Sequence, residues 1–195
     1  MKIAAIIVAA GRSTRFVEGN KLLAAFEGRP LIHHVVSAVC ASPVEDIVLV
    51  TGGDGGKIAA AAGAGRWRHA VNLKAADGLS SSLKAGLASL DANTSGALIV
   101  LADMPRITSD IIALLSAAFI GSGGAAIVFP QTDDGRQGNP VLWPRALFPE
   151  LMALSGDVGG KAVLVRHPKL HCPVTVSGDA TLYDVDTIGD LNPNA

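Results

Sequence analysis

The chain has 195 residues, of which 49% are hydrophobic and 17% are charged, and its formal net charge is -1. This balance excludes a nucleic-acid surface of clustered Lys and Arg, and no apolar run approaches the roughly 18 residues that cross a bilayer. We therefore expect a cytoplasmic protein that binds neither nucleic acid nor membrane, folded as a single domain over residues 1–195. Cys40 and Cys172 lie far apart and form no C-x-x-C pattern, which predicts buried free thiols.

Apolar, β-branched runs alternate along the chain with segments of helical periodicity. In chain order, the pattern predicts a strand at 3–8, a helix at 30–39, a strand at 46–50, a helix at 57–62, a strand at 70–73, a helix at 80–90, a strand at 97–101, a helix at 109–119 and a strand at 125–129. Less regular patterns then predict helices near 145–154 and 159–165 and a last strand at 171–176. The alternation predicts an α/β fold in which a mostly parallel sheet lies between helices on both faces. Ligands of such sheets bind at the carboxyl ends of the strands.

The first predicted strand opens directly onto a loop of small residues and arginines. The loop reads Ala9-Ala10-Gly11-Arg12-Ser13-Thr14-Arg15, and Asn20-Lys21 follows it. Backbone N–H groups of small residues can approach a phosphate closely, and arginine and lysine add positive charge there. The loop has neither the Gly-x-Gly-x-x-Gly spacing nor the Walker A pattern. We interpret it as a triphosphate-binding loop, with an ordinary turn after a buried strand as the alternative.

A run of hydroxyl side chains begins the predicted helix at 80–90. Gly78 precedes Ser80, Ser81 and Ser82, and leucines at helical spacing follow. One serine is enough to cap a helix, whereas three of them behind a glycine can also hydrogen-bond a nucleotide at the positive end of that helix. The cluster therefore predicts a helix cap that can also bind a ligand.

Asp103 is a first candidate for binding a ligand or a metal ion. It comes just after the predicted strand at 97–101, and Pro105 keeps the following backbone extended, which leaves the carboxylate at the open end of the strand. Helix capping is the alternative role, but Thr108 or Ser109 is better placed to cap the next helix.

A second acidic position lies near the end of the chain. Asp184 and Asp186 are two residues apart, so in an extended segment both carboxylates lie on one face. Oxygen ligands suit Mg²⁺, which takes one or two protein carboxylates together with waters and substrate phosphates. An acidic surface strand is the alternative interpretation.

Taken in order, these motifs resemble those of the molybdenum cofactor nucleotidyltransferases, and in particular the branch that uses CTP. The wider superfamily has a Rossmann-like, three-layer fold of the nucleotide-diphospho-sugar transferase type. The matching segments are Ala9-Ala10-Gly11-Arg12-Ser13-x-Arg15, Asn20-Lys21-Leu22-Leu23, Gly78-x-Ser80-Ser81-Ser82-Leu83, Leu101-Ala102-Asp103-Met104-Pro105, Gly138-Asn139-Pro140-Val141-Leu142, Gly156-Asp157-x-Gly159 and Asp184-x-Asp186-Thr187.

The resemblance implies roles for particular residues. Arg15, Lys21 and Asp103 would be catalytic, and Asp103 and Asp186 would bind Mg²⁺, with Mn²⁺ as an alternative. Nucleotide binding would fall to Ala9, Ala10, Gly11, Arg12, Ser13, Arg15, Lys21, Gly78, Ser80, Ser81 and Ser82. Substrate binding would fall to Asn139, Pro140, Gly156 and Asp157.

The implied reaction transfers CMP from CTP to the terminal phosphate of molybdopterin, giving molybdopterin cytosine dinucleotide and pyrophosphate. That phosphate is already ionised near neutral pH, so the reaction needs alignment and charge neutralisation rather than a catalytic histidine. A client molybdoenzyme would be a further partner. One alternative is a cytidylyl- or uridylyltransferase that acts on a sugar or polyol phosphate. Another is a non-catalytic accessory protein that binds the molybdenum cofactor and delivers it to a molybdoenzyme.

Overall fold

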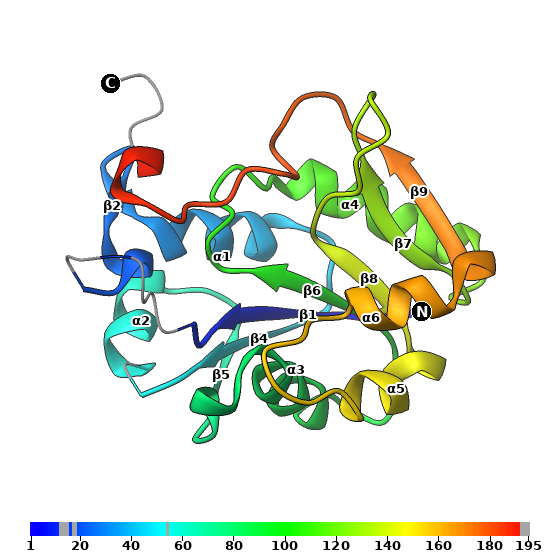
Figure 1. Cartoon of the computed structure of the whole chain (residues 1–195), viewed down its shortest axis with the longest axis horizontal. Helices are drawn as coiled ribbons and strands as arrows, with labels where there is room; N and C mark the ends of the chain where they lie inside the picture. The colour runs from blue at the N-terminus through cyan, green and yellow to red at the C-terminus, as the bar shows by residue number, and fades with distance from the viewer. Residues whose placement is uncertain (12–15, 17–18, 54, 192–195) are drawn as a thin grey trace.

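A seven-stranded sheet with helices on both faces forms the body of the protein (Figure 1). The computed structural model describes residues 1–11, 16, 19–53 and 55–191. The strands of this sheet are β1 (Lys2–Ala9), β4 (Asp46–Thr51), β5 (Arg68–Val71), β6 (Thr94–Leu101), β7 (Ile127–Gln131), β8 (Val141–Pro144) and β9 (His171–Thr175). The helices are α1 (Leu31–Ala41), α2 (Gly55–Ala62), α3 (Leu79–Ala88), α4 (Ser109–Gly121), α5 (Phe148–Met152) and α6 (Lys161–Arg166). The strand order is β5-β4-β1-β6-β8-β7-β9.

Strand β1 illustrates why the sheet is buried on both faces. Ile3, Ala5 and Ile7 belong to the core cluster that also holds the apolar residues of α1, α2 and α4. Ile6 and Val8 belong to the second cluster, formed with α3, α5 and α6. Successive side chains of a strand point to opposite faces, so a continuous apolar run fits two cores at once. The predicted three-layer α/β fold is confirmed.

Strand β8 departs from the predicted pattern. The sheet pairs β1, β4, β5 and β6 in parallel, but β8 runs antiparallel to both β6 and β7. The sequence pattern predicts no strand here, because four residues that end in a proline are too few to show a period-2 alternation. The pairing of Ile99 with Val141 brings the start of β8 to the carboxyl half of β6. The segment that precedes β8 therefore reaches the edge where the parallel strands end.

Two strands, β5 and β7, are displaced by two residues from the predicted ranges 70–73 and 125–129, and short elements account for further differences. The helix predicted near 145–154 is a 3-10 turn, η3 (Arg145–Leu147), followed by α5, in which Pro149 occupies the first turn, where a missing N–H costs nothing. A small hairpin was not predicted, and it pairs β2 (Ala25–Phe26) with β3 (Arg29–Pro30). The remaining 3-10 turns are η1 (Lys21–Leu23), η2 (Ala75–Asp77), η4 (Pro168–Leu170) and η5 (Ile188–Leu191).

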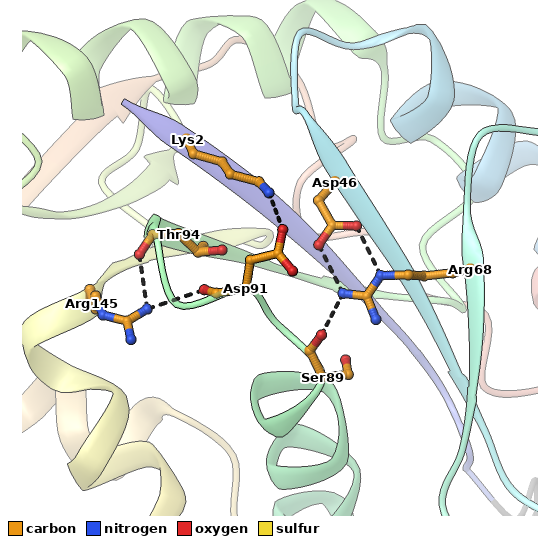
Figure 2. A network of polar contacts seen from close by, with 7 residues as sticks. All are labelled: Lys2, Asp46, Arg68, Ser89, Asp91, Thr94 and Arg145. Carbon is orange, nitrogen blue, oxygen red and sulfur yellow. Dashed lines mark hydrogen bonds and ion pairs between the residues drawn. The ribbon is translucent and has the colours of Figure 1, made fainter.

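The amino ends of the strands are tied together by charged side chains (Figure 2). Arg68, at the start of β5, donates to both carboxylate oxygens of Asp46 at 3.1 and 2.8 Å and to the carbonyl oxygen of Ser89 at 2.6 Å. Lys2, at the start of β1, donates to Asp91. This network joins the amino ends of β1, β4 and β5 to the end of α3.

The two cysteines are free thiols, but both are half-buried rather than buried as predicted. Cys172 lies on β9, which is an edge strand of the sheet, and Cys40 lies one residue before the end of α1. Both positions leave one side of the residue near solvent. Among the described residues, the helices lack the combination of length and apolar character that spanning a membrane requires.

Candidate functional site

A cavity of about 650 Å³ lies at the carboxyl ends of β1 and β6. Its volume falls within the range of small-molecule sites, and its position is the one expected for a ligand of a parallel sheet. Six residues that the sequence motifs singled out line this cavity, namely Ala10, Gly11, Gly78, Ser82, Asp103 and Asp157. The turn η2 and Leu79 form another part of its wall.

Four other nucleotide-binding candidates are not among the described lining residues of this cavity. Arg12, Ser13 and Arg15 fall outside the described residues. Ala9 is the last residue of β1 and is buried, and it does not line the cavity.

The serines make hydrogen bonds other than the predicted helix cap. The hydroxyl of Ser80 donates to the carbonyl oxygen of Gly156 at 2.8 Å, and that of Ser81 donates to the carbonyl oxygen of Gly78 at 2.8 Å. The N–H of Leu79, at the start of α3, instead donates to Oδ1 of Asp157 at 3.2 Å. The N-cap position is occupied by Gly78, so Ser80 and Ser81 lie within the first turn, where their hydroxyls reach nearby carbonyl oxygens rather than cap the first N–H groups. Asp157, predicted to bind the substrate, therefore contacts the start of α3 and lines the first cavity.

The candidate metal-binding carboxylates converge on one lysine. Nζ of Lys21 lies 2.8 Å from Oδ2 of Asp103 and 3.1 Å from Oδ1 of Asp186. The three residues come from the turn η1, the segment after β6 and the segment before η5. Lys21 is 82 residues from Asp103 and 165 residues from Asp186 in the chain, so only the fold brings these charges together.

Backbone hydrogen bonds hold this cluster in place. The N–H of Val185, which is fully buried, donates to the carbonyl oxygen of Asp103 at 3.0 Å. Oδ2 of Asp190 accepts from the N–H groups of Asp186 and Thr187 at 3.0 and 2.7 Å. The position of Asp186 is thus set from both sides by its own chain neighbours.

The electrostatics of the cluster follow from its burial and composition. Burial lowers the pKa of Lys21, but attraction to Asp103 and Asp186 outweighs burial and raises the pKa above its ordinary value. Burial also raises the pKa of Asp184, and repulsion from Asp103 and Asp186 raises it further. Lys21 therefore stays protonated beside the two carboxylates.

The donor set fits a hard divalent cation. Oδ1 of Asp103 is buried and has no hydrogen-bond partner within the described part of the chain. A buried unpaired carboxylate oxygen is costly, and a bound cation would satisfy it. The described residues hold no cluster of three or more His, Cys, Asp or Glu suited to a metal ion. A cation that keeps waters and binds substrate phosphates needs only one or two carboxylates.

A second cavity of about 590 Å³ adjoins the first, and Leu79 and Leu101 line both. Asn139 lines this second cavity, as does the side of Trp143, which is only 2% exposed. Pro140 and Gly156 line neither cavity. Asn139 precedes β8 rather than following a strand, and it reaches this edge of the sheet because β8 is antiparallel.

The sequence motifs did not single out Arg136, Lys161 and Asn72, of which the first two line a cavity and the third contacts Ser82 at a cavity wall. Arg136 and Lys161 line the second cavity, and neither belongs to a recognisable motif. Asn72, which bonds to Ser81 and Ser82, interrupts the apolar strand predicted at 70–73. For Asn72, the signal available in the sequence was a polar residue inside an apolar run.

Comparison with known proteins identifies the family. The family model of the MobA-like NTP transferase domain matches residues 5–171. The chain belongs to this family. The match begins within β1 and ends at the start of β9, so it includes Asp103 and most of both cavities.

Individual relatives are similar to this chain over nearly its whole length. The nicotine blue oxidoreductase of Paenarthrobacter nicotinovorans is 26% identical over 194 residues, which cover 97% of this chain and 94% of that protein. The crystal structure of Rv0371c from Mycobacterium tuberculosis H37Rv aligns with a TM-score of 0.83 and 25% identity over 99% of this chain and 97% of that one. A structure of Rv0371c in complex with manganese aligns with a TM-score of 0.77 and 24% identity, with the same coverage.

A more distant structure confirms the fold class. CMP:2-keto-3-deoxy-manno-octonic acid synthetase, solved in complex with CTP, aligns with a TM-score of 0.77 over 99% of this chain and 96% of that one. Its sequence identity is 13%, so the likeness concerns the fold alone. The chain has the nucleotide-diphospho-sugar transferase fold that the sequence motifs implied.

Proposed function

We propose that this protein transfers CMP from CTP to the terminal phosphate of molybdopterin, forming molybdopterin cytosine dinucleotide and pyrophosphate. The observation that carries the proposal is the convergence of Asp103, Asp186 and Lys21, with Asp103 at the wall of a nucleotide-sized cavity. Membership of the MobA-like NTP transferase family supports nucleotidyl transfer as the reaction class. The small loop Ala9-Ala10-Gly11, which is similar to that of the CTP-using branch, supports CTP as the donor.

Asp103 and Asp186 would hold the divalent cation, Mg²⁺ or Mn²⁺. Oδ1 of Asp103 supports this assignment, because it is buried and has no hydrogen-bond partner among the described residues. The contact of the Lys21 ammonium with both carboxylates supports it as well, because it shows that one cationic group can reach both. When bound, the cation neutralises charge on the phosphoryl oxygens.

The residues of the chain supply binding and alignment. An ionised phosphate is already a nucleophile, so the site must bring it in line with the α-phosphorus of CTP and stabilise the departing pyrophosphate. Lys21 and Arg15 would contribute positive charge to the triphosphate, and the N–H groups around Gly11 would bind its oxygens. The two cavities meet at Leu79 and Leu101, which allows donor and acceptor to lie side by side.

The lining of the second cavity favours a flat acceptor over a sugar. Its described walls are largely apolar and include Trp143, Val141 and Leu164, and the polar side chains on them are Arg136, Gln137, Asn139 and Lys161. A polyol or sugar needs many hydrogen-bonding side chains, whereas a fused heteroaromatic ring needs apolar surface and its phosphate needs positive charge. A pterin phosphate therefore fits this lining better than a sugar phosphate.

One relative favours a second candidate function, an oxidation–reduction reaction, because its name is nicotine blue oxidoreductase. Hydride transfer makes no use of two carboxylates and a lysine at the phosphate end of a cavity, whereas nucleotidyl transfer does. We therefore rank nucleotidyl transfer first and include the alternative in the test.

The test measures pyrophosphate release with CTP, GTP, UTP or ATP and Mg²⁺, with and without molybdopterin. Release is expected with CTP and molybdopterin together. A preference for GTP would refute the assignment of CTP, and release with sugar phosphates but not molybdopterin would refute the acceptor. Oxidation of NADH or NADPH with no pyrophosphate release would support the second candidate.

Asp103→Asn is expected to lower the transfer rate about 100-fold or more while the protein still folds, because the isosteric amide carries no charge to hold a cation. Asp110→Asn makes the same change on the exposed first turn of α4 and is the matched control. Full transfer activity in Asp103→Asn would contradict the proposed metal role. Mn²⁺ binding, followed by electron paramagnetic resonance, separates loss of the cation from loss of the fold.

A further inference from the structure

A buried polar network lies where α3 begins, at the wall of the first cavity. Asn72 follows β5, is 6% exposed, and its N–H donates to the carbonyl oxygen of Thr51 at 2.7 Å. Its side-chain amide contacts two of the three serines on the first turn of α3. Nδ2 lies 2.8 Å from Oγ of Ser81 and 3.0 Å from Oγ of Ser82.

The orientation of the Asn72 amide is determined by the backbone. The N–H of Lys74 lies 2.9 Å from Oδ1 of Asn72, and a backbone N–H can only donate. Oδ1 must therefore face Lys74, and Nδ2 must face the serines. Both hydrogens of Nδ2 are then used, and both serine oxygens act as acceptors.

The two serines differ in whether their own hydroxyl hydrogens have an acceptor. Ser81 donates its hydrogen to the carbonyl oxygen of Gly78. Ser82 is 3% exposed and lines the cavity, and its hydroxyl hydrogen has no acceptor among the residues that the structure describes. A hydroxyl whose oxygen already accepts from an amide, and whose hydrogen is unused, can offer a donor to a ligand in the cavity.

We propose that Asn72 is a positioning residue that makes Ser82 a hydrogen-bond donor to the bound nucleotide. The nucleotide atom opposite Ser82 is then an acceptor, such as a carbonyl oxygen or an unprotonated ring nitrogen of the base, and not an amino group. This inference rests on the proposed function only in taking the first cavity as the nucleotide site.

A double-mutant cycle on Asn72 and Ser82 tests the inference. In Asn72→Asp, one oxygen still accepts from Lys74, but the other can only accept, so Ser82 must turn its hydrogen toward it and away from the cavity. Binding of each of the four nucleoside triphosphates is measured by calorimetry at pH 8 with Mg²⁺, for the wild type, both single variants and the double variant.

The expected result is a strongly non-additive cycle. Asn72→Asp and Ser82→Ala are each expected to weaken binding of the preferred triphosphate about tenfold, which corresponds to about 1.4 kcal/mol. The double variant is expected to bind no more weakly than Ser82→Ala alone. Repulsion between the new carboxylate and the triphosphate would act in both backgrounds, so an additive cycle would overturn the inference. Ser89→Ala, a change of the same kind just beyond the far end of α3, should leave binding unchanged.

Two further measurements keep the outcome decisive. Thermal denaturation reports whether each variant folds, and Asn72→Ala replaces Asn72→Asp in the cycle if the latter does not, with the same non-additivity expected. If the wild type binds none of the four triphosphates, the proposed function fails and this inference fails with it. If it binds one of them, whichever base it carries, and the cycle is additive, only the role of Asn72 is refuted.

Discussion

A single carboxylate, that of Asp190, organises the segment that carries Asp186. It accepts hydrogen bonds from the N–H of Asp186 and from the N–H and hydroxyl of Thr187. These bonds, with the Thr187 N–H foremost, lower the pKa of Asp190 below its ordinary value. The ionised form is therefore stabilised in the folded protein relative to the unfolded chain. This contribution is present above the unfolded carboxyl pKa of about 4 and is lost as the pH falls through the lower, folded pKa.

We predict that Asp190→Asn lowers the melting temperature at pH 7 by about 2–4 °C, because weaker hydrogen bonds to a partly exposed amide cost about 1 kcal/mol. The difference from the wild type should shrink as the pH falls below about 4, where the wild-type carboxylate takes up a proton. Differential scanning fluorimetry across pH 3–8, without divalent metal, measures both effects. A difference that is independent of pH would contradict the role assigned to the charge.

Asp184, two residues before Asp186, should respond with the opposite sign. Burial and the repulsion of Asp103 and Asp186 raise its pKa, so its ionised form costs stability at neutral pH. The stability linked to its protonated form is present below the unfolded pKa and is lost as the pH rises through the folded pKa. Asp184→Asn is therefore expected to raise the melting temperature at pH 7 in the same assay, and a decrease would contradict the assigned electrostatics.

At the scale of elements, the start of α3 depends on contact with the loop before α6. Gly78 has φ of +95° and ψ of -177°, a conformation that is essentially restricted to glycine. A Cβ on Gly78 would lie 2.6 Å from the nitrogen of Asp157. Glycine here allows the backbone at 156–157 to approach the first turn of α3, where Asp157 bonds the N–H of Leu79. This contact forms one wall of the first cavity.

Gly78→Ala is expected to destabilise the protein by about 2 kcal/mol or more and to weaken nucleotide binding, because the loop must move away from α3. Urea denaturation and calorimetry measure the two effects. Gly56→Ala is the matched control, since Gly56 lies within α2 and a Cβ there meets nothing within 4 Å. That change should be neutral or slightly stabilising. Unchanged stability in Gly78→Ala would refute the close-contact argument.

At the scale of the molecule, a stabilising charged network and the candidate site lie at opposite ends of the parallel strands. The charged network of Lys2, Asp46 and Arg68 lies at the amino ends of the strands (Figure 2), whereas both cavities lie at the edge where the parallel strands end. The two ends of a strand are several residues apart, and each residue adds about 3.3 Å along the strand. Substitutions at the amino ends of the strands should therefore change the free energy of unfolding without changing ligand binding at the site.

Arg68→Ala tests this separation. It is expected to reduce the free energy of unfolding by up to about 1 kcal/mol, since the pair with Asp46 is partly exposed, and the loss should diminish at high salt. The affinity for CTP should stay within twofold of the wild-type value, measured by calorimetry. A large change in that affinity would show that the two ends of the strands are coupled.

The repeated elements were the most predictable part of the molecule. The strand predicted at 97–101 lies within β6, and the helix predicted at 109–119 lies within α4, with Thr108 as its cap. Long apolar runs and helical periods identify such elements because burial on two faces requires them. The strand β8 and the hairpin of β2 and β3 were not predictable in this way, because they are short and are stabilised by their neighbours.

The sequence by itself determined the α/β class, the order of the longer strands and helices, and the acidic, glycine-rich and hydroxyl motifs, because these depend on residue type and local spacing. Only the tertiary structure decided that Lys21 lies between Asp103 and Asp186, that Asp157 meets the start of α3, and that Asn72 orients Ser82. Such contacts join residues from separate elements, and their geometry depends on strand order and helix packing. A periodic pattern specifies which face of an element is buried, but it does not specify which distant side chain that face will meet.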